Sequence, residues 1–286
     1  MGKRLETSRT RSLQWRKSGI TIGLYLLIGL FLIWTLFPIF WIFLTSLKTT
    51  QQINAIPPLF VFKPTFENYV HVFSGKTMTA LQNSLIISCS TVVLGIVVGL
   101  PAAYVLARAR FKARGQVNFW ILSMRMAPPF AFIVPYYLTF RFLGLLDTHL
   151  ALILINLTFS LPFAVWMLES VISDLPAEIE EAALIDGCSR FGVIRQIVVP
   201  LTAPSIAATA ILTFIFSWNE FFFANILTGT TTQTMPVTLI SFIGLMGVNW
   251  VQMSAAGIVA IVPTIILALL AQRFLVRGLT LGAVKS

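Results

Sequence analysis

Long apolar runs recur along this chain, and they limit its possible folds more than any other feature. The first runs from about Gly19 to Leu47, which exceeds the roughly 20 apolar residues that cross the hydrocarbon of a bilayer. Only 10% of the 286 residues are charged and the mean hydropathy is +0.88, whereas a soluble domain carries about 25% charged residues. We therefore expect a membrane protein. Because backbone groups must be satisfied internally in lipid, its spans should be α-helices.

The pattern of apolar runs predicts an all-α polytopic protein with six transmembrane helices. A signal peptide would have a shorter apolar core than 19–47, so this run is interpreted as an uncleaved first span. A more polar external loop at 48–82 separates it from a five-helix core at 83–272. The predicted spans are 19–47, 83–107, 117–142, 150–172, 204–227 and 254–271.

Basic residues cluster beside particular spans and set the expected orientation. The tail 1–18 carries six Lys and Arg residues, and a second cluster at 108–114 follows the second span. Because cytoplasmic segments carry an excess of Lys and Arg, we expect this cluster and both tails, 1–18 and 273–286, in the cytoplasm. The same topology explains the net charge of +10, so no nucleic-acid partner is expected.

The third span is not expected to be a regular helix. Pro128, Pro129 and Pro135 remove backbone donors within it, which should kink or break the helix. Arg125 lies just before the break. An arginine at that depth either faces an aqueous pathway or extends its side chain to the cytoplasmic interface, and both interpretations stay open.

Two later spans also carry polar residues. Asn156 lies in the fourth, and Asn219 and Glu220 lie in the fifth. Glu220 would sit about 24 Å along that helix, at 1.5 Å per residue, as a wall group of a solute cavity or as an interfacial residue beside Trp218. We take Arg125, Asn156, Asn219 and Glu220 as candidate residues of a translocation pathway.

The longest charged interruption of the C-terminal half lies between 176 and 200. Acidic side chains follow Pro176, and both features suit the first turn of a helix. Gly187 is placed as a left-handed stop. A helix is therefore predicted over about 176–186, about 16 Å long. The spacing alone does not distinguish a functional helix from an amphipathic loop helix that only closes a membrane bundle.

The same stretch resembles the EAA motif in the permease subunits of binding-protein-dependent ABC importers. Two positions depart from the usual pattern: Cys188 stands where alanine is common, and Ile194 where phenylalanine is common. Both changes are conservative in size or polarity. The matching residues are Glu181, Ala182, Ala183, Asp186, Gly187, Ile197 and Pro200.

Three further segments resemble the maltose-type (carbohydrate) branch of this family: the loop 46–69, the run 125–135 and the tail 273–285. The resemblance implies the type I ABC importer permease fold, with six transmembrane helices and a cytoplasmic coupling helix at about 176–190. It places the chain in a bacterial-type inner membrane. It also gives the motif residues the role of coupling transport to an ATPase.

The resemblance further implies partners and a cargo. This subunit would pair with a second, usually different, permease subunit. Two ATPase subunits would dock at the cytoplasmic face, and an external solute-binding protein would deliver a sugar or sugar-like solute for import by alternating access. The chain itself would be no enzyme and would bind no cofactor, since ATP and Mg²⁺ would lie on the ATPase subunits.

Other chemical signals are weak. The run 75–77 lacks the first glycine of a Walker A loop, because position 70 is Val70. His71 and His149 are isolated and no catalytic set is visible, so neither a metal site nor a catalytic site is expected. The alternative function is a secondary transporter driven by an ion gradient, which would use inverted repeats or an intramembrane carboxylate relay. A membrane scaffold without transport is a third interpretation.

Overall fold

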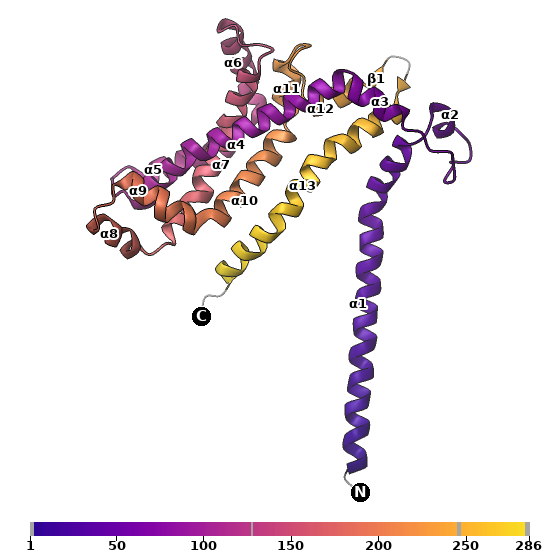
Figure 1. Cartoon of the computed structure of the whole chain (residues 1–286), viewed down its shortest axis with the longest axis horizontal. Helices are drawn as coiled ribbons and strands as arrows, with labels where there is room; N and C mark the ends of the chain where they lie inside the picture. Colours follow the sequence, from indigo (N-terminus) through magenta and orange to yellow (C-terminus); the bar gives the residue numbers. More distant parts are fainter. Residues whose placement is uncertain (1–2, 127, 245–246, 284–286) are drawn as a thin grey trace.

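The computed structural model describes the backbone of residues 3–126, 128–244 and 247–283, and the side chains of these ranges except at 3–20, 125, 271 and 273–283. Helices dominate the described chain (Figure 1). They are α1 (Lys3–Ser46), α2 (Thr50–Ile53), α3 (Glu67–Ser74), α4 (Lys76–Arg108), α5 (Arg114–Met126), α6 (Pro129–Phe142), α7 (His149–Ser173), α8 (Ala177–Ile185), α9 (Arg190–Val193), the π-helical turn η1 (Ile194–Val198), α10 (Val199–Trp218), α11 (Phe222–Leu227), α12 (Met235–Ile240) and α13 (Trp250–Ala283). A short antiparallel pair, β1 (Ile243–Gly244) and β2 (Gly247–Val248), precedes α13 and pairs Ile243 with Val248.

Five helical stretches are long and apolar enough to cross a membrane: Thr21–Ser46, α4, α7, Arg190–Trp218 and Trp250–Leu270. The pair α5 and α6 forms a sixth if it counts as one span, although it bends by 89°. The bend lies where consecutive prolines, Pro128 and Pro129, cannot donate to the preceding turn. The predicted all-α polytopic fold and the predicted break in the third span are therefore confirmed.

The bundle is built around α4, which packs against α7 and α10. Glycines allow the close approach that helices in lipid use for association. A Cβ atom on Gly99 would lie 3.4 Å from the Cβ atom of Ala164 in α7, and one on Gly95 would lie 3.9 Å from Cγ2 of Thr213 in α10. Gly95 and Gly99 therefore mark the places where α10 and α7 pack against α4.

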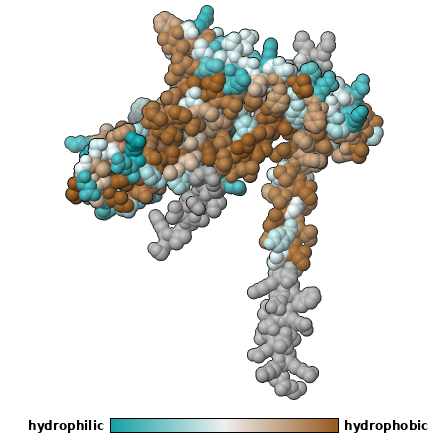
Figure 2. Space-filling model, viewed as in Figure 1, coloured by the Kyte–Doolittle hydropathy of each residue, from teal (hydrophilic) through white to brown (hydrophobic). Residues whose placement is uncertain are grey.

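Polar side chains gather at two separate ends of the apolar body (Figure 2). One group surrounds α8 and α9; the other lies around α2, α3 and α12, which we call the loop end. In the second group, Lys48 is buried at the end of α1, with its Nζ atom 4.8 Å from the ring centroid of Trp41 and 5.0 Å from that of Phe62. Cation–π contacts of this kind offset part of the cost of burying an ammonium group.

The fifth span differs from the prediction at both ends. It was expected over 204–227, but α9, η1 and α10 form one continuous helical run from Arg190 to Trp218. Pro200, which precedes the predicted span, and Pro204, with which that span was expected to begin, both lie inside the observed helical run. A local π-helical turn just before them is the kind of adjustment by which membrane helices accommodate proline.

The segment between the predicted fifth and sixth spans, 228–253, contains more regular structure than a loop. It contains α12 and the β1–β2 pair, and α13 already begins at Trp250 instead of 254. Asn249 explains this earlier start, because its side-chain Oδ1 atom accepts a hydrogen bond from the backbone amide of Gln252 at 3.3 Å, as an N-terminal cap does.

Candidate functional site

The segment between α7 and α10 contains two short helices, α8 and α9, with a turn between them. The predicted helix at 176–186 is α8, Ala177–Ile185, with Pro176 just before its first turn. Gly187 has a φ of +90°, and the backbone amide of the next residue donates to the carbonyl of Ala183 at 3.0 Å. This left-handed stop was predicted and is confirmed. It also means that the helix does not extend to about 190 as expected.

A second turn of helix follows directly. The Ser189 hydroxyl accepts a hydrogen bond from the amide of Gly192 at 3.1 Å and caps α9. Ile197 lies in the π-helical turn η1, and Pro200 lies in the first turn of α10. The motif residues therefore fall on α8, on the left-handed turn that ends it and on the helical run that follows.

Most of the motif residues are exposed at the surface. Glu181, Ala182, Asp186, Gly187 and Pro200 are exposed, whereas Ala183 and Ile197 are half-buried. Large apolar side chains lie among them: Ile185 is 86% exposed and Phe191 is 71% exposed. We call the surface formed by 181–187 and Phe191 the α8 face. A mixed surface of this kind, small, acidic and apolar, is suited to contact with another protein.

Beneath this face lies an ion pair between residues that are far apart in the sequence. Glu180 is 5% exposed, and its Oε1 atom accepts from Arg108 of α4, whose Nη2 and Nε atoms lie at 2.7 and 2.9 Å. The Tyr104 hydroxyl, one turn earlier on α4, donates to Oε2 at 2.9 Å. Three glutamates lie close together in the sequence at 178–181, so sequence alone did not show which of them turns inward.

The candidate pathway residues are only partly brought together. Asn156 and Glu220 both line a cavity of about 170 Å³, together with Pro129, Phe159 and Phe216. Asn219 is exposed, does not line this cavity, and donates its side-chain amide to the carbonyl of Ile215 at 2.8 Å. The side chain of Arg125 lies outside the described residues.

Glu220 has a different setting from the one expected. The helix α10 ends at Trp218, so Glu220 is not part of the span. Its two carboxylate oxygens accept from the backbone amides of Phe223 at 2.8 Å and Ala224 at 2.9 Å, at the start of α11. The carboxylate thus satisfies amides that a helix start leaves free, while it also borders the cavity.

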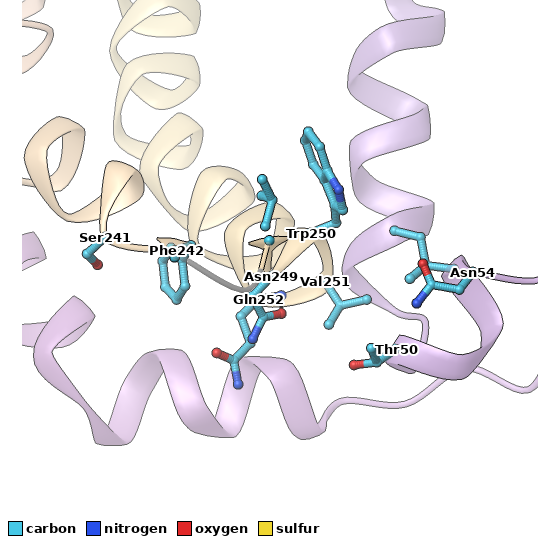
Figure 3. A pocket seen from close by; sticks show the side chains of 12 residues that line it. Thr50, Asn54, Ser241, Phe242, Asn249, Trp250, Val251 and Gln252 are labelled. Atoms are coloured by element: carbon cyan, nitrogen blue, oxygen red, sulfur yellow. Dashed lines mark hydrogen bonds between the residues drawn. The ribbon is translucent and has the colours of Figure 1, made fainter.

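The loop end carries a larger polar hollow. Figure 3 shows side chains from the beginning of α13, among them Trp250 and Gln252, on one side, and Thr50 and Asn54 near α2 on the other. The hollow has a volume of about 470 Å³. A second one of about 370 Å³ adjoins it and shares Thr50 and Gln252. The lining combines side-chain amides with the exposed indole ring of Trp250.

The segment 228–235, which we call the strap, is held by side chains of α4 and of the turn before α7. Asn83 donates to the carbonyls of Thr231 and Gln233 at 3.0 Å each, and its own oxygen lies 2.8 Å from Nε2 of His149. Asp147 accepts from the strap. Burial alone would raise the pKa of Asp147, but hydrogen bonds from Thr232 and Thr231 outweigh it and hold this pKa well below its usual range.

His149 is thus engaged with an amide. His71 lies 4.0 Å from Glu67, one turn earlier on α3. Among the described side chains, no three His, Cys, Asp or Glu residues come close enough together to hold a metal ion.

Comparison with known proteins identifies the family. The model of the family described as "Binding-protein-dependent transport system inner membrane component" matches residues 95–281, more than half of the chain. The probable ABC transporter permease protein y4oR of Sinorhizobium fredii is 39% identical over 87% of this chain and 90% of its own length. The trehalose/maltose transport system permease protein MalG of Thermococcus litoralis is 35% identical over 87% of this chain and 91% of its own. The trehalose transport system permease protein SugB of Mycobacterium tuberculosis is 37% identical over 88% and 93%.

A solved structure shares the fold over most of its length. A subunit of a bacterial ABC transporter involved in the import of the acidic polysaccharide alginate superposes with a TM-score of 0.77 and 25% identity, covering 89% of this chain and 95% of that one. These matches leave the secondary-transporter and scaffold alternatives without support. The chain belongs to the family of binding-protein-dependent transport system inner membrane components, and it is a multi-pass, non-enzymatic permease subunit of an ABC importer.

Proposed function

We propose that this subunit carries a sugar or sugar-like solute into the cytoplasm by alternating access. The names of the relatives support this cargo, since one is described as a trehalose/maltose and another as a trehalose transport system permease protein. Energy would come from ATP and Mg²⁺ on two partner ATPase subunits, and this chain would bind no cofactor.

The α8 face is the proposed contact with an ATPase subunit. The proposed coupling residues are Glu181, Ala182, Ala183, Asp186 and Gly187 on this face, together with Ile197 in η1 and Pro200 in α10. The observation that carries this proposal is the exposure of Ile185 and Phe191 at the polar end of an otherwise apolar body. Burying a side chain of that size stabilises a complex by about 1.5–3 kcal/mol. Small neighbours such as Ala182 allow the partner surface to approach closely.

The coupling requirement can be stated as a difference in binding. To reverse a two-state population from 1:99 to 99:1, a partner must favour one state by about 5.5 kcal/mol. The ATPase subunits would therefore hold the α8 face more tightly in one nucleotide state than in the other. Every tenfold difference in affinity supplies about 1.4 kcal/mol of that amount.

The proposed solute pathway passes the cavity that Asn156 and Glu220 line. Its present volume of about 170 Å³ is below the range of about 300–1,000 Å³ of most small-molecule sites, so we assign it to the wall of a pathway that opens in the other state. Arg125 and Asn219 remain proposed as further pathway residues.

At the opposite side, the polar hollow beside Trp250 is proposed to face the external solute-binding protein. In this proposed orientation the loop end lies outside, and the α8 face and both termini lie in the cytoplasm. The basic cluster 108–114 then lies inside, as the positive-inside bias requires. A second permease subunit, which we propose to be a different chain, would complete the pathway.

The test compares two identical substitutions on opposite sides. Ile185→Asp places a charge on the α8 face, and Ile56→Asp places it at the loop end, where Ile56 is 97% exposed. We expect the first variant to lose its ATPase subunits on co-purification by about tenfold or more, and its uptake with them. Ile56→Asp should keep the ATPase subunits bound.

Glu181→Lys provides a second variant on the same face and should also abolish uptake without preventing insertion in the membrane. The proposal fails if Ile185→Asp and Glu181→Lys both retain normal uptake and a normal amount of bound ATPase.

A further inference from the structure

The one buried residue among the nine of α8 is a charged one. Glu180 is buried, while the other side chains of the helix are exposed or half-buried. Burying a carboxylate is costly unless it is paired and hydrogen-bonded. Glu180 is the one carboxylate of α8 that is buried in this way. Its bonds are therefore the main polar attachment of α8 to the helices below it.

The hydrogen bonds of Glu180 satisfy its whole carboxylate group. Both carboxylate oxygens are engaged, one by the Arg108 guanidinium and the other by the Tyr104 hydroxyl. Arg108 also donates from Nη2 to the carbonyl of Leu175 at 2.8 Å, in the connection between α7 and α8. One side chain of α4 therefore holds both the helix and the segment that leads to it. Charge-assisted bonds of this kind are stronger and geometrically stricter than neutral ones.

The backbone offers α8 no comparably stiff connection. Before α8 the chain passes through the non-helical residues 174–176, and after it through the turn 186–189. A non-helical connection absorbs a displacement by changes in φ and ψ. A displacement of α8 would therefore be absorbed by these two connections unless side-chain contacts transmit it to the bundle.

The receiving helix is well placed to pass the displacement on. Tyr104 and Arg108 are on the last turns of α4, and the same helix packs against α7 at Gly99 and α10 at Gly95. Closely packed helices move as units, because packed interfaces do not deform continuously.

We propose that Glu180 is a positioning residue for coupled transport: it transmits the displacement of α8 to α4 through Arg108 and Tyr104. The inference rests on the proposed coupling role of the α8 face but makes a separate claim. The α8 face decides whether an ATPase subunit binds, whereas Glu180 decides whether the motion of α8 reaches the bundle.

The experiment uses the assembled transporter in proteoliposomes and measures solute uptake and ATP hydrolysis together. Glu180→Gln keeps the shape of the side chain and removes its charge. We expect ATPase subunits to remain bound and hydrolysis to continue, while solute molecules moved per ATP fall by about tenfold, within the usual range of coupling between sites. Glu178→Gln, an exposed acid two residues earlier on the same helix, is the matched control and should leave this ratio unchanged.

Two further variants separate transmission from simple folding. Tyr104→Phe removes a single hydroxyl and should lower the ratio less than Glu180→Gln does. The exchange Glu180→Arg with Arg108→Glu restores an ion pair in reverse and should recover part of the ratio that each single variant loses.

The outcomes are distinct. If Glu180→Gln and Tyr104→Phe leave uptake per ATP unchanged, the inference is wrong while the proposed coupling face stands. If Glu180→Gln releases the ATPase subunits, Glu180 only shapes the docking surface and the inference is also wrong. If the unaltered chain never retains ATPase subunits, the proposed function itself fails.

Discussion

Asp147 and Thr232 lie 85 positions apart, yet both the backbone amide and the hydroxyl of Thr232 donate to Oδ1 of Asp147, at 3.0 and 2.6 Å. The other oxygen accepts from the Thr231 hydroxyl at 2.7 Å and from the amides of Thr230 and Thr231 at 3.2 Å each. One carboxylate thus holds the strap against the turn before α7.

Replacing this carboxylate by an amide should open the strap. In Asp147→Asn only one oxygen remains as an acceptor, so one set of threonine bonds must be lost. We expect the amides of residues 230–232 to exchange with solvent at least about tenfold faster, as locally less stable segments do. Hydrogen exchange measured by mass spectrometry checks this. Asp174→Asn, at an exposed helix end, should leave the strap unchanged.

The hydrogen bonds that hold the strap should weaken only in strong acid. Because the folded-state pKa of Asp147 is lowered, its contribution to stability is present above the ordinary aspartate pKa of about 3.9 and is lost as the pH falls below that value. Protection of the strap amides, corrected for intrinsic exchange, should be constant from about pH 7 to pH 5. A loss of protection already within that interval would contradict the assignment of the bonds to an ionised Asp147.

Gly187 should be sensitive to the smallest possible side chain. A Cβ atom at this position would have no atom within 4 Å, so the whole cost of Gly187→Ala comes from the φ of +90°. A non-glycine residue in the left-handed region costs about 1–2 kcal/mol. We expect uptake to fall several-fold at an unchanged amount of protein in the membrane.

Gly115→Ala is the control for this change, because Gly115 also has open space around it but lies inside α5. There alanine should be neutral or stabilise by up to about 1 kcal/mol. Equal effects of the two variants on uptake would show that the left-handed turn has no part in function.

Two threonines on α10 should differ in their response to the same substitution. Thr209 and Thr213 are both fully buried, but the Thr209 hydroxyl donates to the carbonyl of Ser205 at 2.8 Å, whereas the Thr213 hydroxyl has no hydrogen-bond partner among the described residues. Valine has the shape of threonine without the hydroxyl. Thr213→Val should therefore keep or raise the melting temperature of the purified protein. Thr209→Val should lower the melting temperature, because it removes a hydrogen bond that contributes about 0.5–1.5 kcal/mol to the free energy of unfolding.

A larger decrease for Thr213→Val than for Thr209→Val would mean that the Thr213 hydroxyl finds a partner that this conformation does not show. Ser217, one turn later on α10 with a similarly unpaired hydroxyl, would then be the next position to substitute.

Features that depend on local chemistry could be predicted from the sequence. The break at Pro128 and Pro129 follows from missing amide donors, and the left-handed stop follows from Gly187, which alone among its neighbours adopts this backbone conformation without strain. The apolar runs located the spans because crossing a bilayer requires a minimum length.

Features that depend on contacts between residues far apart in the chain could not be predicted from the sequence. Glu180 pairs with Arg108 from 72 positions away, and the basic cluster at 108–114 had been interpreted only as a determinant of orientation. The fifth span differs from its predicted bounds for two reasons. A π-helical turn carries the helix through Pro200, and the Glu220 carboxylate accepts from amides in the first turn of a separate helix, α11, within an apolar stretch of sequence. No local pattern distinguishes these cases.

The helix α1 diverges from the rest of the molecule, and none of its most apolar window within Thr21–Ser46 is buried (Figure 1). At 1.5 Å per residue this arm is about 39 Å long. A detergent micelle around the isolated subunit must coat the arm as well as the bundle. Its hydrodynamic radius will then exceed that of a compact monomer of 31.7 kDa, and only a method that separates protein mass from detergent mass will report how many copies are present.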